Sequence, residues 1–338
     1  MWIINVLLPV LLITAAVAVI LFLATNAVAL ALIRKKMFGY HFTHDPDIPT
    51  YTPDGVGVYK TPIEVELEGQ MIRGGIYSPK KGGSDPDTLI IVCHGMWGSH
   101  LSYMQEVGYF CSSGFDVIGF DYIGTASSDG DDLGGFGQSL RCLNRIIEYV
   151  KATDGLSHRK IWVYGHSWGG YAVSNVAKFH PDIAGIVAMA PAASFQAVTK
   201  NMFPKFSHFL IPVMVTLDRK AMGEFSGLSA AESLEGYNGK ALFIHSEDDP
   251  MCPYATTTGE IKEKFGNKFD YLILKDKGHN PQYTHEGLAL MREYNRKASE
   301  LKEEEDKIKL KRETDFLAMG KLDDGVMNAV VSYIKNAA

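Results

Sequence analysis

The sequence predicts an α/β protein with a largely parallel central sheet that is covered by helices on both faces. From residue 88 onward, short runs that are apolar at every position alternate with stretches of helical periodicity. A strand that is apolar at every position is typical of a sheet buried on both faces. The chain has 338 residues with 46% hydrophobic content, which is enough material for one large domain or two small ones.

The chain begins with an apolar segment, residues 1–36, that we interpret as a transmembrane anchor with a basic flank. No charged side chain occurs between positions 2 and 33, and this run exceeds the roughly 20 apolar residues that span a bilayer as a helix. A cleaved signal peptide is the competing interpretation, but it would have a basic start and an apolar core of only about 7–15 residues. Because Arg34, Lys35 and Lys36 follow the run, the positive-inside rule predicts a cytoplasmic domain. A secreted or extracytoplasmic domain is the alternative.

The segment 37–61 is rich in His, Asp, Pro and Gly, which predicts a linker. Residues 62–338 are predicted to form one domain that opens with a β-hairpin of residues 63–68 and 71–77. Buried strands are then predicted at residues 89–93, 117–120, 161–165, 183–189, 241–244 and 271–274. Helices are predicted at residues 102–111, 136–150, 256–265 and 323–334, and directly after position 167. Such alternation implies a parallel sheet between two layers of helices.

Two insertions interrupt this alternation. Residues 191–239 are unusually apolar for a segment outside a sheet. They are either an ordinarily packed helical excursion or a cap that lines an acyl-binding pocket, since substrate clefts are mostly apolar. Residues 286–320 are dense in Glu, Lys and Arg with only a thin apolar stripe. Such runs are typical of solvated helices held by i, i+4 charge pairs, and self-association through the stripe is the alternative.

The stretch from Gly165 to Gly169, Gly-His-Ser-Trp-Gly, joins a predicted buried strand to a helical pattern and places Ser167 on the turn. A serine hydroxyl is a weak nucleophile unless a base accepts its proton, and a sharp turn exposes the oxygen to both base and substrate. Glycines flank the turn because side chains there would collide as the strand and the helix approach each other. Ser167 is therefore the candidate nucleophile, and His166 is interpreted as a packing residue beneath the sheet edge.

Two later strand ends carry residue types that would complete such a site. Asp248 and Asp249 follow the predicted strand 241–244, and His279 follows the predicted strand 271–274. The carboxyl ends of parallel strands lie along one edge of a sheet, so these side chains are expected to meet Ser167 in space. His245 is interpreted as a supporting or core residue beside the acid.

With this order of serine, acid and histidine, the chain from about residue 62 to its C-terminus resembles serine hydrolases of the α/β-hydrolase superfamily. The similarity extends to esterases and lipases such as the monoacylglycerol lipases, and to the catalytic domains of prolyl oligopeptidase-type enzymes. It implies an α/β-hydrolase fold. It favours Asp249 over Asp248, because the acid of this superfamily commonly precedes a proline-containing turn such as Asp249-Pro250, and it identifies His279 as the base.

The same resemblance implies the roles of the site residues. His279 would take the proton of Ser167, and Asp249 would orient the imidazole and stabilise its positive form. The backbone N–H groups of Met96 and Trp168 would bind the oxyanion. Dehalogenase and epoxide hydrolase members of the superfamily use an aspartate at the turn, so Ser167 argues against both chemistries.

We therefore expect a membrane-anchored serine hydrolase that cleaves lipid or short-chain acyl esters through an acyl-enzyme intermediate. A serine peptidase of the prolyl oligopeptidase type and a non-catalytic binding member of the fold are the alternatives. No cofactor or metal is expected, because the 4 cysteines lie far apart and His41 and His44 have no further ligands nearby. The net charge of -6 argues against a nucleic-acid partner, and the oligomeric state stays open.

Overall fold

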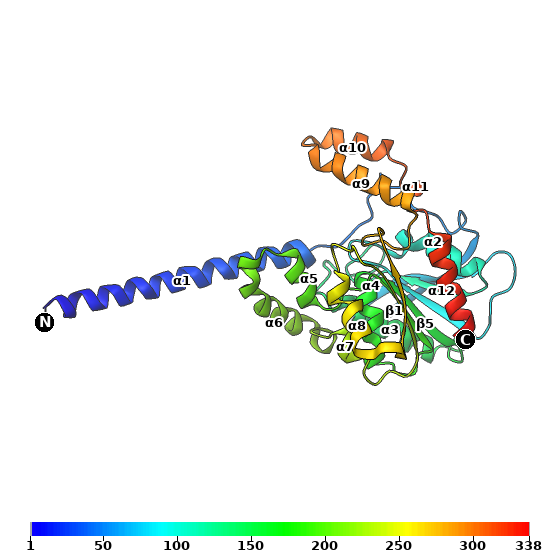
Figure 1. The fold of residues 1–338 in the computed structure, drawn as a ribbon, viewed down its shortest axis with the longest axis horizontal. Helices are drawn as coiled ribbons and strands as arrows, with labels where there is room; N and C mark the ends of the chain where they lie inside the picture. The colour runs from blue at the N-terminus through cyan, green and yellow to red at the C-terminus, as the bar shows by residue number, and fades with distance from the viewer. Residues whose placement is uncertain (1, 338) are drawn as a thin grey trace.

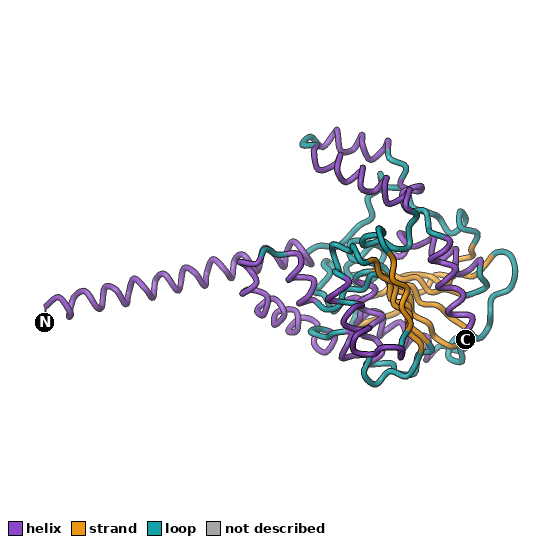
Figure 2. The backbone as a smooth tube through the Cα atoms, in the orientation of Figure 1, coloured by secondary structure: helices purple, strands orange, loops and turns teal. Residues whose placement is uncertain are grey.

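The computed structural model describes residues 2–337, with side chains described at all of them except 2–9, 18–24, 27 and 29. Helix α1, Trp2–Phe38, projects from a globular body, and the helices of residues 285–319 also stand out from this body (Figure 1). The tube view shows the strands gathered at the centre of that body with helices around them (Figure 2). The α/β prediction is therefore confirmed.

A single sheet of 8 strands, in the order β1-β2-β4-β3-β5-β6-β7-β8, forms the centre of this body. The hairpin of β1 and β2 is antiparallel, β2 also pairs with β4 in the antiparallel sense, and all other neighbours are parallel. The mostly parallel sheet predicted from the sequence is thus present. The strands are β1 Val58–Leu67, β2 Gln70–Pro79, β3 Thr88–Cys93, β4 Asp116–Phe120, β5 Lys160–His166, β6 Gly185–Met189, β7 Lys240–Ser246 and β8 Asp270–Leu274.

Helices cover both faces of the sheet, and alternate residues of each central strand point to opposite layers. In β3, Ile91 belongs to the hydrophobic cluster that includes residues of α3 Gln138–Ala152, α4 Trp168–Asn175 and α8 Thr258–Phe265, whereas Ile90 belongs to the cluster that includes residues of α2 Met104–Ser112 and α12 Asp324–Ala337. Every residue of β3 and β4 is buried. This two-sided burial is the reason that these strands are apolar at every position.

The first insertion, between β6 and β7, is helical, and we call it the cap. It consists of α5 Phe195–Met202, η3 Lys205–Leu210, α6 Ile211–Met222, η4 Gly223–Phe225 and α7 Ala230–Ser233. The cap packs against the C-terminal turns of α1, where Phe38 is buried and its ring centroid lies 5.8 Å from that of Phe195. Helix α1 therefore extends two residues past the predicted anchor boundary and is joined to the domain by side-chain packing.

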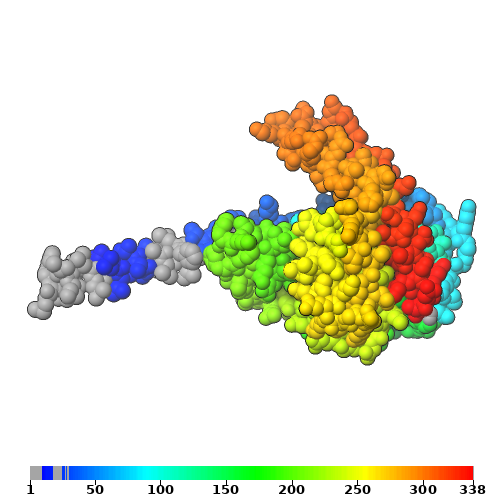
Figure 3. All heavy atoms as spheres, viewed as in Figure 1, coloured from blue at the N-terminus to red at the C-terminus, as the bar shows by residue number. Residues whose placement is uncertain are grey.

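The second insertion forms an arm that stands away from the body (Figure 3). The arm consists of α9 His285–Glu300, α10 Glu304–Glu313 and α11 Phe316–Met319. Its helices pack through Tyr294 and Phe316, whose ring centroids are 5.2 Å apart, and an ion pair joins Lys311 to Asp45 of the segment after α1. The remaining short helices are η1 His100–Tyr103, η2 Val176–Lys178, η5 Tyr254–Thr256 and η6 Gly266–Lys268.

The predicted transmembrane anchor falls partly on positions of α1 whose side chains lie outside the described part of the structure. Within the part that is described, no helix combines the length and the apolarity that crossing a membrane requires.

Candidate active site

Ser167 occupies the turn between β5 and α4 in a strained backbone conformation. Its φ of 57° and ψ of -112° lie in a region that residues with a Cβ rarely adopt. Such strain costs about 1–3 kcal/mol and persists where the surrounding structure imposes it. The turn lifts the Ser167 side chain out of the sheet edge and into a cavity.

Two glycines make this turn sterically possible. A Cβ built on Gly165 would lie 2.3 Å from the carbonyl oxygen of Gly169, and a Cβ on Gly169 would lie 2.2 Å from the carbonyl oxygen of Cys93. Real Cβ atoms do not approach backbone oxygens so closely. The glycine spacing noted in the sequence therefore reflects contact between α4 and the ends of β3 and β5.

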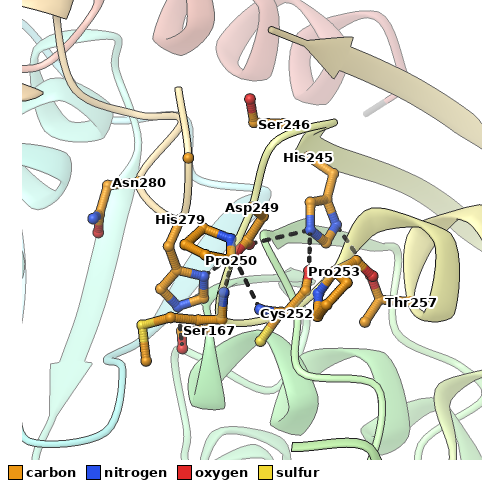
Figure 4. Close-up of polar contacts among 12 residues, drawn as sticks. Ser167, His245, Ser246, Asp249, Pro250, Cys252, Pro253, Thr257, His279 and Asn280 are labelled. Carbon is orange, nitrogen blue, oxygen red and sulfur yellow. Dashed lines mark hydrogen bonds and ion pairs between the residues drawn. The ribbon is translucent and has the colours of Figure 1, made fainter. Parts of the chain in front are cut away.

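The structure brings Ser167, His279 and Asp249 into one hydrogen-bonded chain (Figure 4). His279 Nε2 lies 2.8 Å from Ser167 Oγ, and His279 Nδ1 lies 2.8 Å from Asp249 Oδ2. Asp248 does not take part, because its Oδ1 accepts hydrogen bonds from the Ser246 hydroxyl and from the Gly278 N–H. The three strand ends thus meet as the parallel topology predicts, and the geometry distinguishes the two neighbouring aspartates.

Asp249 is held as a carboxylate. Burial of its side chain favours the neutral form, but hydrogen bonds from His245 and His279 outweigh burial and hold the pKa of Asp249 well below its usual range. Asp249 Oδ1 also accepts the backbone N–H groups of Met251 at 2.8 Å and Cys252 at 2.9 Å. An ionised Asp249 can therefore stabilise a positively charged His279 without itself taking up the proton.

His245 supports this carboxylate from the side opposite His279. Its Nε2 lies 3.2 Å from Asp249 Oδ2 and 2.7 Å from the carbonyl oxygen of Cys252, while its Nδ1 lies 2.8 Å from Thr258 Oγ1. The side chain is fully buried. The sequence-based interpretation of His245 as a supporting residue beside the acid agrees with these contacts.

A second buried network, which the sequence did not indicate, runs through Tyr103 and His166. The Gly95 N–H donates to the Tyr103 hydroxyl at 2.9 Å, and this oxygen lies 2.8 Å from His166 Nδ1. His166 Nε2 lies 2.8 Å from the backbone carbonyl of His279. Because a carbonyl only accepts, Nε2 carries the proton and Nδ1 accepts from Tyr103.

Burial lowers the pKa of His166 to about 3, and repulsion from His279 acts in the same direction. His166 is therefore neutral, which is the state that the two hydrogen bonds require. His166 has a more specific place than the packing role predicted from the sequence. It connects the loop after β3, through Tyr103, with the loop that carries His279.

The two residues predicted to supply the oxyanion donors belong to the same cavity as Ser167. Met96 and Trp168 both line the cavity that contains Ser167. Trp168 is the first residue of α4, so its backbone N–H has no acceptor within the helix. Its indole N–H donates to the carbonyl of Phe136 at 2.7 Å, which fixes the side chain in the core and leaves the backbone at the cavity edge.

The cavity above Ser167 has a volume of about 780 Å³ and lies between the cap and the arm. Val198, Asn201 and Met202 of α5 line one wall, and Met291 and Asn295 of α9 line another. Among the described residues that line it, none is Asp, Glu, Lys or Arg. In the described part of the chain, no group of at least three His, Cys, Asp or Glu side chains is placed so that it could hold a metal ion.

Comparison with known proteins adds a family match over part of the chain. Residues 84–235 match the family model described as Hydrolase_4, serine aminopeptidase, S33. This segment includes Ser167 and ends before Asp249 and His279.

Two sequence relatives are informative. The Bacillus subtilis protein YqkD is 23% identical over 281 residues, which cover 78% of this chain and 90% of that protein. Bifunctional epoxide hydrolase 2 of Rattus norvegicus is 28% identical over 138 residues, which cover 38% of this chain and only 24% of that enzyme.

Solved structures resemble a larger part of the chain. The esterase Pf2001 of Pyrococcus furiosus has a TM-score of 0.55 at 16% sequence identity, and the match covers 77% of this chain and 97% of that one. Acetyl xylan esterase 1 from Thermoanaerobacterium has a TM-score of 0.52 at 18% identity, and the match covers 70% and 82%.

Proposed function

The chain has the α/β-hydrolase fold, and from this premise we propose that it is a serine hydrolase that cleaves carboxylic esters. One observation carries the proposal. The hydrogen-bonded chain of Ser167, His279 and Asp249 ends at the floor of a cavity whose described lining has no charged Asp, Glu, Lys or Arg side chain. A neutral acyl ester fits such a lining, because charged groups lose solvation in it without gaining a partner.

In the proposed reaction, His279 Nε2 takes the proton of Ser167 as Ser167 Oγ attacks the ester carbonyl. Ionised Asp249 holds the Nδ1–H and stabilises the imidazolium that forms. His279 then gives the proton to the leaving alcohol oxygen as the carbon–oxygen bond breaks, which leaves an acyl group on Ser167. Water, deprotonated by His279, releases the acid in the same way.

The tetrahedral intermediates carry a negative charge on the former carbonyl oxygen. We assign its stabilisation to the backbone N–H groups of Met96 and Trp168, two residues that line the cavity of Ser167. The Trp168 N–H also lies at the N-terminus of α4, where the helix dipole favours negative charge. One such donor is worth about 3 kcal/mol of the activation barrier.

A serine aminopeptidase is the second candidate, and the name of the matching family model favours it. An aminopeptidase must hold the positively charged amino terminus of its substrate near the nucleophile, which a carboxylate side chain does best. No Asp or Glu is among the described residues that line this cavity. This favours the ester over the peptide.

We further propose that the enzyme is attached to a membrane by α1 and that the hydrolase domain faces the cytoplasm. The apolar run 2–33 supports attachment, as do the exposed apolar side chains at described positions of α1, which include Leu11, Ile13 and Leu32 at 65%, 64% and 62% exposure. The basic residues that follow the run support the orientation. Labelling of intact cells with a membrane-impermeant reagent tests it, because a labelled domain would contradict the cytoplasmic orientation.

The activity is tested with the full chain in detergent micelles and p-nitrophenyl esters of graded acyl length. The wild type should hydrolyse them, and Ser167→Ala should lower kcat by roughly four orders of magnitude or more. Equal, slow hydrolysis by both proteins would refute ester hydrolysis at Ser167. Aminoacyl p-nitroanilides measured in parallel test the aminopeptidase.

A fluorophosphonate probe tests the alternative of a non-catalytic binding protein. It should form an adduct on Ser167 of the folded wild type, since the probe reacts with an activated serine. The absence of an adduct on folded protein would favour the binding protein.

A further inference from the structure

The cap presents an exposed apolar stripe, which we define as Phe206, Phe209 and Val213. The exposed fractions of these side chains are 82%, 55% and 45%. Phe206 and Phe209 are three residues apart in the 3-10 helix η3, so they lie on the same side of it, and Val213 follows on the first turn of α6. Exposed apolar side chains are common when scattered, whereas a continuous stripe of them marks an interaction surface.

The stripe is continuous with α1. Val213 and Leu217 line a groove of about 790 Å³ together with Leu30, Arg34 and Phe38 of α1. Val28 and Leu32, one turn apart on α1, are 60% and 62% exposed. Figure 3 shows the cap, in green, at the end of the body from which α1 projects. Any surface that meets α1 where it leaves the body therefore also meets η3.

The charged residues between positions 183 and 217, the segment that contains the stripe, are all cationic, whereas Asp132 lines the groove beside the stripe and Glu224 is exposed later in the cap. No Asp or Glu occurs between positions 183 and 217, nor before Asp45, although the whole chain has a net charge of -6. The cations of these two segments are exposed on the cap and on the last turns of α1: Arg34, Lys35, Lys36, Lys200 and Lys205. Aromatic and apolar side chains bordered by lysine and arginine match the interface of a bilayer that contains anionic lipids.

A second copy of the chain fits this surface less well. A symmetric dimer would place the same patch of both copies face to face. That arrangement would bring the two sets of lysine and arginine side chains together, where like charges repel. An anionic lipid surface instead offers apolar volume and negative charge at the same place.

We propose that the cap stripe inserts into the surface of an anionic bilayer, so that the cap docks on the same membrane as α1. This inference rests on the proposed function, in which α1 attaches an ester hydrolase to a membrane. Its consequence is a route for substrate. Met202, at the C-terminal end of α5, is 45% exposed and lines the cavity of Ser167. An acyl ester dissolved in the bilayer would enter the cavity at α5 without crossing water.

Docking is measured directly on the full chain reconstituted in phosphatidylcholine vesicles with and without phosphatidylserine. All four native cysteines are buried, so a thiol-reactive, environment-sensitive dye should label only an introduced cysteine. Phe206→Cys reports on the stripe, and Ser157→Cys, exposed in the loop before β5, is the matched control. A lipid with a nitroxide near its headgroup should quench the dye at position 206 severalfold more than at 157, and more strongly with phosphatidylserine.

Equal quenching at the two positions would overturn the proposal. Dye emission at position 206 that depends on protein density in the vesicle, and not on the nitroxide lipid, would assign the stripe to a second copy and overturn it as well.

The kinetic test uses two substrates, an ester dissolved in the vesicles and a water-soluble ester. Phe206→Ser should lower the ratio of vesicle-borne to soluble hydrolysis by about tenfold, because burial of the ring in the interface is lost. Lys200→Gln and Lys205→Gln, each made singly, should both lower this ratio by about fivefold with anionic vesicles. Tyr59→Ser, which removes a 62% exposed aromatic side chain from β1, is the control and should leave the ratio unchanged.

Soluble hydrolysis that persists with an unchanged ratio in the cap variants would refute docking while leaving the proposed function intact. If the wild type hydrolyses neither ester, the proposed function fails, and the quenching result alone then decides whether the cap docks.

Discussion

Tyr103→Phe is the most informative single substitution, because it removes one oxygen from the centre of the second network. The phenol ring and its packing stay. The Gly95 N–H loses its acceptor at 2.9 Å, and His166 Nδ1 loses its donor at 2.8 Å. Both groups are buried. A buried polar group without a partner costs about 1–3 kcal/mol, so with two such groups the free energy of unfolding should fall by roughly 2–6 kcal/mol.

The same change should slow the reaction. Tyr103 holds the loop that contains Met96, and His166 holds the carbonyl of His279 at 2.8 Å. Loss of the hydroxyl frees both loops to shift by a fraction of an ångström. Misplacement of reacting groups on that scale costs about ten- to a hundredfold in rate. We expect the loss mainly in kcat, because ester binding depends chiefly on the apolar walls of the cavity.

The assay separates rate from folded fraction. Active sites of wild type and Tyr103→Phe are counted with the fluorophosphonate probe, kcat and KM are measured with a soluble ester, and urea unfolding gives the stability. Tyr109→Phe is the matched control, since the Tyr109 hydroxyl is exposed and its contact with the carbonyl of Asp324 is long, at 3.5 Å. A kcat per counted site equal to that of the wild type would refute the positioning role, even if stability fell.

Three further predictions follow from individual contacts. Asp249→Asn should lower kcat by about 10⁴-fold, since the amide favours the wrong imidazole tautomer. Asp248→Asn should lower kcat much less. Similar losses of kcat in both variants would contradict the assignment of Asp249 as the acid. Gly169→Ala should lower the free energy of unfolding, measured in urea, by at least about 1–3 kcal/mol, because the added Cβ would lie 2.2 Å from a backbone oxygen. Gly236→Ala is the control, because the space around its Cβ is open. Burial raises the pKa of Glu106 from 4.5 to about 8. A carboxyl whose pKa is raised in the folded state contributes stability that is lost as the pH rises between those two values, at about 1.4 kcal/mol per pH unit. Glu106→Gln should flatten that part of the stability-versus-pH curve, and an unchanged slope would show that Glu106 is not its source.

The sequence predicted those parts of the fold that leave a periodic pattern. Strands such as β3 and β5 are apolar at every position because helices cover both faces, and this burial is visible in the residue types. The turn at Ser167 was recognisable because close contact between α4 and two strand ends leaves room only for glycine at positions 165 and 169. The parallel topology predicted that Ser167 and His279 would meet an aspartate at the third strand end, and the resemblance to α/β-hydrolases favoured Asp249 because a proline follows it.

Other features leave no such pattern. The hydrogen bond between Tyr103 and His166 joins residues far apart in the sequence, and neither has a neighbouring residue that indicates it. The arm was predicted as a solvated charged segment, which fits most of its surface. Its contribution of Met291 and Asn295 to the cavity depends on how α9 is placed over the sheet edge, and tertiary placement of this kind is not encoded in charge spacing.

The arm contributes to the cavity wall but hardly to the packing of the domain, although in an enzyme the same residues usually do both. Its three helices bury only Gly287, Leu288 and Met319, and it is inserted between the loop of His279 and the last helix, outside both hydrophobic layers. Most residues of the arm can therefore be substituted, and its helices extended, without disturbing the packing of the sheet. Because α9 nonetheless forms part of the cavity wall, such substitutions would directly alter the selectivity of the cavity for substrates. Transplanting arms between homologous chains is a route to new specificities on an unchanged catalytic body.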